Sequence, residues 1–377
     1  MGDLKNKTAL NIPWAKPSFF DKEKEYLIAA LESTWISDGH FLDRLEREFA
    51  TYCKLKYALT ASNGTTALHL AYLALGLGPG DEVVVPGFGF LAAANMALLV
   101  GATPVFAEVE PKTWCVNAAE IKKCITSRTK AIVPVHTYGN VCDLDDILDL
   151  AAQKNIPLVE DAAEAFASKY KGKFAGTMGD IGIFSFQATK TITTGEGGMV
   201  VTSKQELYDK MALYRSHGML RKKYYWHELP GHNFRLTNLQ AALGCAQFEN
   251  LENIIHERKR IHAKYINCLS QNPGISLQVF SADVAPVLWA IAMKLDPKAY
   301  PQGRDRVIVQ MKERQVETRP GFYAPSLMKH IYQCPKLPVC EEISRQVISL
   351  PTYVSLADEQ IEYICEQLFI LGEGHEI

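Results

Sequence analysis

The chain has 377 residues, 47% of them hydrophobic, and its 40 Lys and Arg residues nearly balance its 42 Asp and Glu residues. A formal charge of −2 provides no field for gripping a nucleic acid or an anionic membrane, so we expect neither as a partner. No apolar run reaches the roughly 20 residues that span a bilayer. Because residues 1–7 carry no apolar signal segment, we expect a cytoplasmic protein.

The first two thirds of the chain alternates helical stretches with short β-branched runs, which is typical of a mostly parallel α/β sheet. Helices are predicted at Asp21–Ser33, Phe41–Tyr52 and Thr65–Leu77. Strands are predicted at Glu82–Val85, Thr103–Ala107, Ala131–Val135, Pro157–Val159, Ile181–Ser185 and Gly198–Thr202.

One long helix is predicted from Thr237 to Leu269. Beyond Pro273 the pattern changes to shorter elements, at Val287–Lys294, Arg306–Glu313 and Leu356–Ile370. We therefore predict a large α/β domain over residues 1–250 and a smaller α+β domain over residues 251–377.

Nine cysteines are scattered along the chain without a C-x-x-C pair. This spacing predicts neither a disulfide framework nor a zinc ribbon, so we expect no metal site. The common nucleotide-binding patterns G-x-G-x-x-G and G-x-x-x-x-G-K-[ST] are also missing from the sequence.

The segment Ser62–Thr66 follows an apolar run and opens a helical stretch. Its small residues allow backbone N–H groups at a helix N-terminus to close on an anion, although a plain helix cap would have the same residues. Two polar side chains follow predicted buried strands. Asp161 is either a ligand group at a strand end or a helix cap, and Lys190, beside a Gly-rich turn, is either a nucleophilic amine or a solvated lysine.

Together these three features are the parts that a pyridoxal 5′-phosphate (PLP) site requires: a phosphate cradle, an acid for the ring nitrogen and an amine for the aldehyde. An ionised Asp161 would hold the ring nitrogen protonated, because a nearby opposite charge raises the pKa of a base. An aromatic side chain should stack on the ring. Phe90 is placed to do so, with Phe88 as its rival.

From about Pro13 to Ile370 the chain resembles the DegT/DnrJ/EryC1/StrS sugar aminotransferases, and its motifs are most similar to the GDP-perosamine synthase branch. The matching segments are Trp35–Gly39, Ser62–Leu70, Gly76–Pro86, Gly101–Val105, Pro134–Gly139, Glu160–Ala165, Ser185–Thr202, Gly231–Ala242 and Glu317–Pro320. The resemblance implies the aspartate-aminotransferase fold (fold type I).

The resemblance also implies roles for single residues. Lys190 would bond the cofactor aldehyde and shuttle protons, Asp161 would face the ring nitrogen, and Glu164 would lie near the ring hydroxyl. The remaining cofactor contacts would be Phe90 on the ring, Gly64, Thr65 and Ser185 on the phosphate, and Asn233 reaching the phosphate from a neighbouring subunit. A homodimer with active sites at the subunit interface follows from that last contact.

Enzymes of this family usually move an amino group from L-glutamate to a keto sugar, commonly a nucleotide-linked one, for surface polysaccharides or antibiotics. Members that remove a hydroxyl group carry His in place of the lysine, so Lys190 argues against such a dehydratase. A regulatory member would be expected to lack the lysine or the aspartate, and this chain has both.

The segment after Pro320 departs from the family. Many relatives have Pro-Leu-His there, whereas this chain has Gly321–Met328 and no histidine before His330. The usual sugar contact would then be replaced, with Tyr323 and Ser326 as candidates. This departure keeps open a free sugar acid as acceptor, such as 8-oxo-3-deoxy-octulosonate. Arg235 and Arg319 are either partners of a substrate carboxylate or members of structural ion pairs.

Overall fold

A computed structural model describes residues 11–220, 222–223, 225–328 and 332–372. The N-terminal residues 1–7 and His330, on which two of the expectations above rest, lie outside these ranges. The first part of the fold contains α1 Lys22–Glu32, α2 His40–Cys53, β1 Tyr57–Ala61, α3 Gly64–Leu75, β2 Glu82–Pro86, α4 Ala92–Leu99, β3 Thr103–Ala107, α5 Ala118–Cys124, β4 Thr129–Ile132, α6 Leu144–Lys154, β5 Val159–Asp161, β6 Lys169–Tyr170, β7 Lys173–Phe174, β8 Ile181–Ser185, β9 Gly198–Thr202 and α7 Gln205–Arg215.

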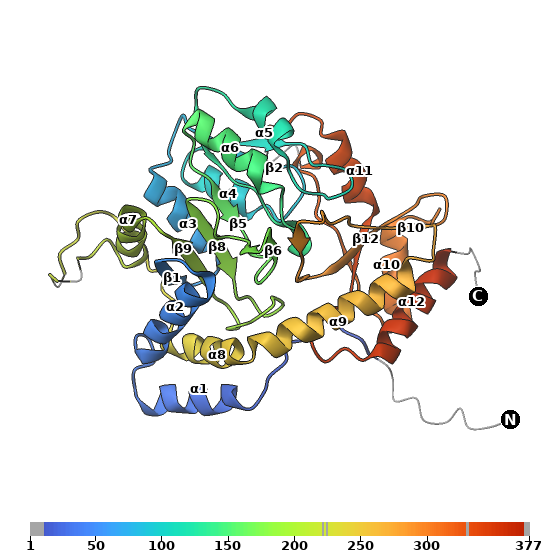
Figure 1. Ribbon diagram of the computed structural model, residues 1–377, viewed down its shortest axis with the longest axis horizontal. Helices are drawn as coiled ribbons and strands as arrows, with labels where there is room; N and C mark the ends of the chain where they lie inside the picture. The colour runs from blue at the N-terminus through green and yellow to red at the C-terminus, as the bar shows by residue number, and fades with distance from the viewer. Residues whose placement is uncertain (1–10, 221, 224, 329–331, 373–377) are drawn as a thin grey trace.

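The second part contains α8 Asn238–Glu249, α9 Leu251–Leu269, β10 Ile275–Leu277, β11 Val284–Ala285, β12 Ile291–Leu295, α10 Arg304–Glu313, β13 Arg319–Pro320, α11 Pro338–Gln346, β14 Val347–Leu350 and α12 Asp358–Gly372. Figure 1 shows α9 running from α8 to the C-terminal helices. No helix in the described ranges is long and apolar enough to cross a bilayer.

The central sheet is mixed and mostly parallel, as predicted. Its strands run in the order β1-β9-β8-β5 and β4-β2-β3, and parallel bridges such as Val135 to Asp161 join the two groups. Among these strands β9 alone runs opposite to the others, and it pairs antiparallel with both β1 and β8. The carboxyl ends of β1, β5 and β8 therefore lie at the same edge of the sheet.

Buried apolar side chains explain why this sheet is stable. Every residue of β2, β8 and β9 is buried, and α3 packs against β8 and β9. The C-terminal elements have a hydrophobic cluster of their own, which includes Tyr265, Met293 and Ile348. That second cluster agrees with a separate smaller domain, but the boundary at 250/251 stays a prediction.

The long helix predicted from Thr237 to Leu269 is wrong, because the structure has two helices that meet at Asn250. This residue leaves the helical region, with φ −95° and ψ 10°. Its side chain donates to the carbonyl of Ala246 at 3.3 Å, and such local bonds from Asn compete with helix continuation. The break lets α8 pack on α1 and α2 while α9 leads away.

Candidate active site

A pocket of about 520 Å³ opens at the carboxyl ends of β5 and β8, next to the N-terminus of α3. This volume suits a cofactor or small substrate. The residues that line it come from the sheet edge, from α3 and from the C-terminal part: Trp14, Asn63, Gly64, Thr65, Leu68, Phe90, Ala92, Val135, Tyr138, Asp161, Ala163, Glu164, Ile183, Ser185, Gln187, Thr189, Lys190, Glu196, Trp289, Arg319, Pro320, Phe322 and Ser349. The predicted residues Gly64, Thr65, Phe90, Asp161, Glu164, Ser185, Lys190 and Arg319 are among them.

The N-terminus of α3 forms one end of the pocket. Asn63 caps the helix through a bond from the amide of Thr66 to its Oδ1 atom, at 2.8 Å. That cap leaves the amides of Gly64 and Thr65 available at the start of the helix. Gly64 also allows a close approach to Ser185, since a Cβ atom on Gly64 would lie 3.0 Å from Ser185 Cβ. Helix amides beside a serine hydroxyl suit a phosphate group.

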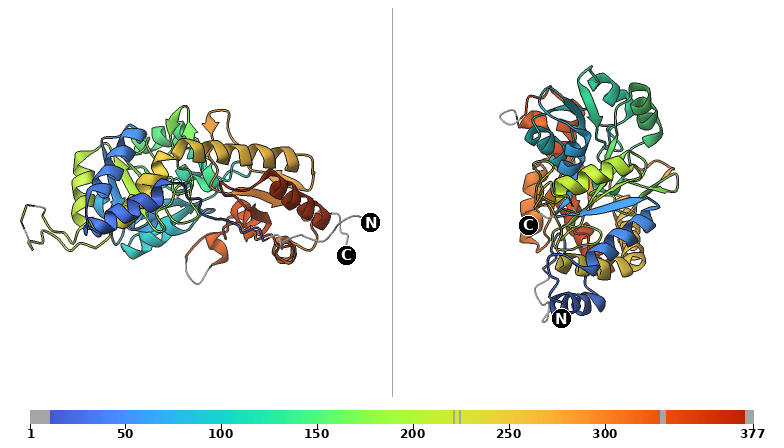
Figure 2. Two further views of the ribbon diagram at one scale, coloured as in Figure 1. Left: turned by 90° about the horizontal axis from the view of Figure 1, so that it is seen from below. Right: turned by 90° about the vertical axis from the view of Figure 1, so that its left-hand side faces the viewer.

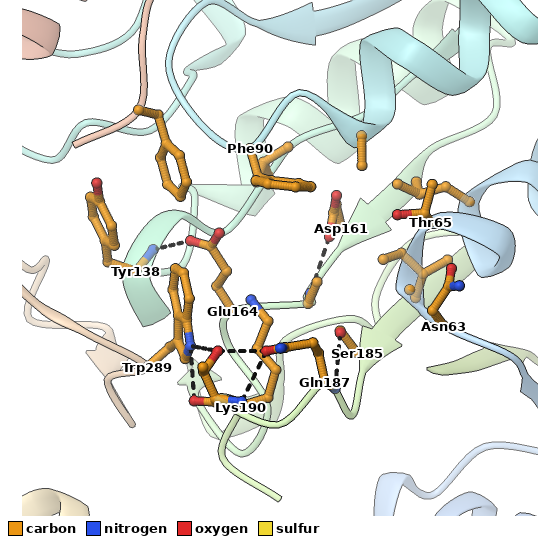
Figure 3. Close-up of a pocket in the computed structure, with 18 of the residues that line it drawn as sticks. Asn63, Thr65, Phe90, Tyr138, Asp161, Glu164, Ser185, Gln187, Lys190 and Trp289 are labelled. Carbon is orange, nitrogen blue, oxygen red and sulfur yellow. Dashed lines mark hydrogen bonds between the residues drawn. The ribbon is translucent and has the colours of Figure 1, made fainter. Parts of the chain in front are cut away.

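Asp161 ends β5 with its carboxylate in the pocket (Figure 3). Both of its backbone groups are bonded to the neighbouring segment: its amide donates to the carbonyl of Pro134 at 2.9 Å, and its carbonyl accepts from the amide of His136 at 3.0 Å. The amide of Ala163 donates to Oδ1 at 3.1 Å. Burial raises the pKa of Asp161, and nearby Lys190 and His136 act against that rise. A buried acid that is held in place suits a cation such as a protonated ring nitrogen.

Lys190 and Glu164 approach the pocket from another side. Burial lowers the pKa of Lys190, while the Glu164 and Asp161 carboxylates favour its charged form. Burial also raises the pKa of Glu164 to about 7, and its Oε2 atom accepts a bond from the amide of Tyr138 at 2.8 Å. An amine with a lowered pKa is a better nucleophile at neutral pH, and an acid with a pKa near 7 can take up or release a proton.

Aromatic rings that the sequence analysis did not single out form a wall beside Lys190. Its Nζ atom lies 3.6 Å from the ring centroid of Trp289. The rings of Tyr138, Trp289 and Phe322 are nearly parallel, with interplanar angles of 11° to 15°. Tyr138 lies in the Pro134–Gly139 segment that resembles the family, which could have marked it. We find no comparable signal for Trp289.

Phe90 lies across the pocket from Lys190 (Figure 3) and is 60% exposed. Its rival Phe88 is fully buried in the core and does not line the pocket. Phe90, and not Phe88, is therefore the ring that a planar ligand in the pocket could stack on.

The structure does not bring the other predicted residues into this pocket. Asn233 and Arg235 lie on the segment between α7 and α8, where Arg235 Nε donates to Asn233 Oδ1 at 3.1 Å. Tyr323 and Ser326 also lie outside the lining. Ser326 is buried and its hydroxyl donates to Glu341 at 2.9 Å, so the structure gives no support to the expected sugar contact there. Phe322 lines the pocket instead.

The lining fits PLP in three respects. The α3 amides and Ser185 can hold its phosphate, the Asp161 carboxylate can face its ring nitrogen, and the Lys190 amine can reach its aldehyde. The wide face of Phe90 suits its aromatic ring.

Comparisons with known proteins identify the family of this chain. A model of the DegT/DnrJ/EryC1/StrS aminotransferase family matches residues 18–369. GDP-perosamine synthase from Escherichia coli O157:H7 is 43% identical over 364 residues, which cover 95% of this chain and 97% of that protein. PseC from Helicobacter pylori, an aminotransferase involved in the biosynthesis of pseudoaminic acid, has a TM-score of 0.91 and 26% identity, covering 97% of this chain and 100% of PseC.

Spr1654 from Streptococcus pneumoniae, in its PLP-form, also has a TM-score of 0.91 and 26% identity, covering 97% of this chain and 99% of the other. The family match spans nearly the whole chain. The chain belongs to the DegT/DnrJ/EryC1/StrS family of PLP-dependent sugar aminotransferases.

Proposed function

We propose that this protein transfers the amino group of L-glutamate to the carbonyl of a nucleotide-linked 4-keto-6-deoxy sugar, for the synthesis of a bacterial surface polysaccharide. The observation that carries the transfer chemistry is the meeting of Lys190, Asp161 and the α3 N-terminus in one pocket. The choice of sugar is supported by the similarity to GDP-perosamine synthase from E. coli O157:H7.

PLP, when bound, supplies an aldehyde that takes up an amino group and a ring that draws electrons from the substrate carbon. In this proposal Lys190 offers its neutral amine and later moves a proton at Nζ. Asp161 stays ionised and keeps the ring nitrogen protonated. Glu164, whose pKa burial raises to about 7, holds a proton beside the Lys190 amine. The Trp289 ring covers one side of the Lys190 amine.

The proposal includes a homodimer in which Asn233 of one subunit completes the phosphate site of the other. Asn233 lies outside the pocket of its own chain, so its side-chain amide could donate to a phosphate only in the pocket of a second copy. The segment between α7 and α8 extends away from the body at the end opposite α12 (Figures 1 and 2). Large apolar side chains are exposed at Trp35, Leu99 and Tyr225, as expected of surfaces that a second copy would cover.

The experiment is a half-reaction with defined acceptors. The protein is converted with L-glutamate to the pyridoxamine form, and the return of PLP absorbance is followed after adding single sugars. GDP-linked and other nucleotide-linked 4-keto-6-deoxy sugars should restore the absorbance within one turnover time. Free keto and aldehydo sugar acids should not. Restoration by a free sugar acid alone would favour the octulosonate alternative, and restoration by neither class would contradict both.

Arg319 provides a matched test of the amino donor. Its guanidinium lies 3.3 Å from Glu317 and 4.4 Å from the Trp14 ring centroid, at the edge of the pocket. If it pairs with the donor carboxylate, Arg319→Gln should raise the KM for L-glutamate and leave the sugar half-reaction unchanged. An equal loss in both half-reactions would argue that Arg319 has a structural role.

A further inference from the structure

Arg258 on α9 is a buried cation that lies directly behind the site. Only 4% of the Arg258 surface is exposed. Its Nη1 atom donates to the carbonyls of Leu288 at 3.1 Å and Trp289 at 3.3 Å, and its Nη2 atom donates to the carbonyl of Lys190 at 3.2 Å. Among the described parts of the chain, none of the ion pairs includes Arg258, so three carbonyls surround this charge in place of a carboxylate.

This arrangement is costly. Removing a cation from water without an acidic partner is unfavourable, and burial lowers the pKa of Arg258 to about 10. That pKa still lies well above neutral pH, so the guanidinium remains charged. An apolar side chain at this position would leave the three carbonyls without these donors, so Arg258 has a structural role. Its positive charge has a second effect, because it opposes the charged form of the Lys190 amine.

The three carbonyls belong to the two segments that form the reactive side of the pocket. Trp289 Nε1 donates to the carbonyl of Thr189 at 3.1 Å, and the Trp289 ring lies against the Lys190 amine. Arg258 links the two segments on the side away from the pocket, because it donates to the backbone carbonyls of Lys190 and of Trp289. A shift of either segment would break one of its bonds.

We propose that Arg258 is a positioning residue, which fixes the Lys190 and Trp289 segments together and places a positive charge at the Lys190 backbone, from where it acts on the Lys190 amine. This inference rests on the role proposed for Lys190. It does not depend on which sugar is the acceptor.

The groups that face Lys190 explain why a second positive charge matters. Asp161 at the end of β5, Glu164 in the following turn and the Trp289 ring all favour the charged ammonium form. Desolvation and Arg258 oppose them, and both lower the pKa of Lys190. Without Arg258 the two carboxylates would hold more of the amine in its protonated, unreactive form.

Competitive amine labelling measures this effect without a substrate. Cofactor-free protein is labelled with an amine reagent across a pH series, and modification at Lys190 is compared by mass spectrometry with that at the exposed Lys298 in the same sample. Arg258→Met removes the charge. Arg258→Lys keeps the charge but loses the planar guanidinium, which donates to carbonyls of both segments at once. Arg304→Met is the control, since Arg304 is also buried and bonds carbonyls, of Ser344 and Val347, but is not among the charges that act on Lys190.

In Arg258→Met the Lys190 profile should move up by roughly 0.5 to 1 pH unit, as expected for loss of a like charge at an effective dielectric near 20. Arg258→Lys should keep the wild-type profile but lose about ten- to a hundredfold in kcat, because the backbone is held less firmly. Arg304→Met should lower stability and leave the Lys190 profile in place.

An unchanged Lys190 profile in folded Arg258→Met would overturn the proposal and assign Arg258 to structure alone. If that variant does not fold, Arg258→Gln replaces it, with the same expected shift. If neither folds, Arg258→Lys decides: wild-type kcat overturns the proposal, and a lower kcat with unchanged KM and labelling profile supports it. If the Lys190 labelling profile moves as expected in Arg258→Met but the wild-type protein turns over no sugar, the role proposed for Arg258 stands and only the proposed function is refuted.

Discussion

The backbone amide of Tyr138 donates to Glu164 Oε2 over 2.8 Å, from a left-handed conformation with φ 61°. This region is unfavourable for an aromatic residue, at a cost of order 1–3 kcal/mol. The conformation is held by the packing of the Tyr138 ring against Phe322 and by the bond from the Trp289 amide to the Tyr138 carbonyl, at 3.1 Å. The strained residue thus donates to the carboxylate that favours the charged form of Lys190 most strongly.

Glu164→Gln should change how stability depends on pH. Because burial raises the folded pKa of Glu164 from 4.5 to about 7, the folded state binds this proton more tightly than the unfolded chain does. The wild-type protein therefore loses stability as pH rises from about 4.5 to 7. The free energy of unfolding of Glu164→Gln should therefore rise relative to that of the wild type over this pH range, by up to about 3 kcal/mol.

Urea unfolding of the cofactor-free protein at several pH values measures this gain. Glu313→Gln, at an exposed glutamate, is the control and should show no such trend. A constant difference between Glu164→Gln and wild type from pH 4.5 to 8 would mean that Glu164 titrates normally.

Asp161→Asn should reduce kcat on the order of a hundredfold or more, because the amide cannot supply the negative charge that stabilises the protonated ring. The fold should not suffer, since burial already disfavours the charged form of this carboxylate. Steady-state kinetics and thermal unfolding of the apo protein check both statements, with the exposed Asp149→Asn as the matched control. A variant with wild-type kcat would remove Asp161 from the mechanism.

Gly64→Ala should weaken cofactor binding by roughly tenfold, since overpacking commonly costs about 1–3 kcal/mol. The new Cβ atom would lie 3.0 Å from Ser185 Cβ and 3.4 Å from its hydroxyl oxygen, so the cradle must widen. Titration of the apo protein with PLP gives the Kd. Gly78→Ala is the control, because nothing lies within 4 Å of its added Cβ. Equal affinities in the two variants would show that the close approach is unimportant.

Lys190→Ala should fold but lose transamination, because no amine remains at this position to bond the cofactor. Borohydride treatment should attach PLP covalently to the wild-type protein and to Lys298→Ala but not to Lys190→Ala, as intact-mass measurement would show. Transamination by Lys190→Ala at the wild-type rate would refute the assignment of the nucleophile.

The position of Asp161 and Lys190 could be predicted because both follow buried strands, and the carboxyl ends of parallel strands meet at one edge. Gly64 and Thr65 could be predicted for a similar reason, since small residues precede a helical period. These inferences need only local patterns. The break at Asn250 was missed because apolar periodicity continues on both sides of it, and a single side-chain bond to the backbone ends α8.

Trp289 and Arg258 were missed for a different reason. Trp289 lies 99 positions after Lys190 in the chain, and Arg258 lies in a run of charged residues that resembles a solvated helix face. Their contacts with Lys190 arise only when α9 and the C-terminal part pack on the sheet. Sequence patterns at short range carry no record of such contacts.

Mixed dimers test whether Asn233 acts across the subunit boundary. Asn233 lies outside the pocket of its own chain, so Asn233→Ala and Lys190→Ala homodimers should both have low activity. In a mixed dimer of these two chains, one site would have Lys190 together with Asn233 from the other chain. Random exchange of equal amounts should then restore activity to about one quarter of the sites.

The two chains carry different affinity tags, so the mixed dimer can be purified and its oligomeric state checked by sedimentation. Its activity per dimer should approach half that of the wild type, because one of two sites is intact. An Asn233→Ala homodimer with full activity would contradict any role for this side chain. A mixed dimer no more active than the two parents would place Asn233 in its own subunit's site, and an active monomer would refute the shared interface.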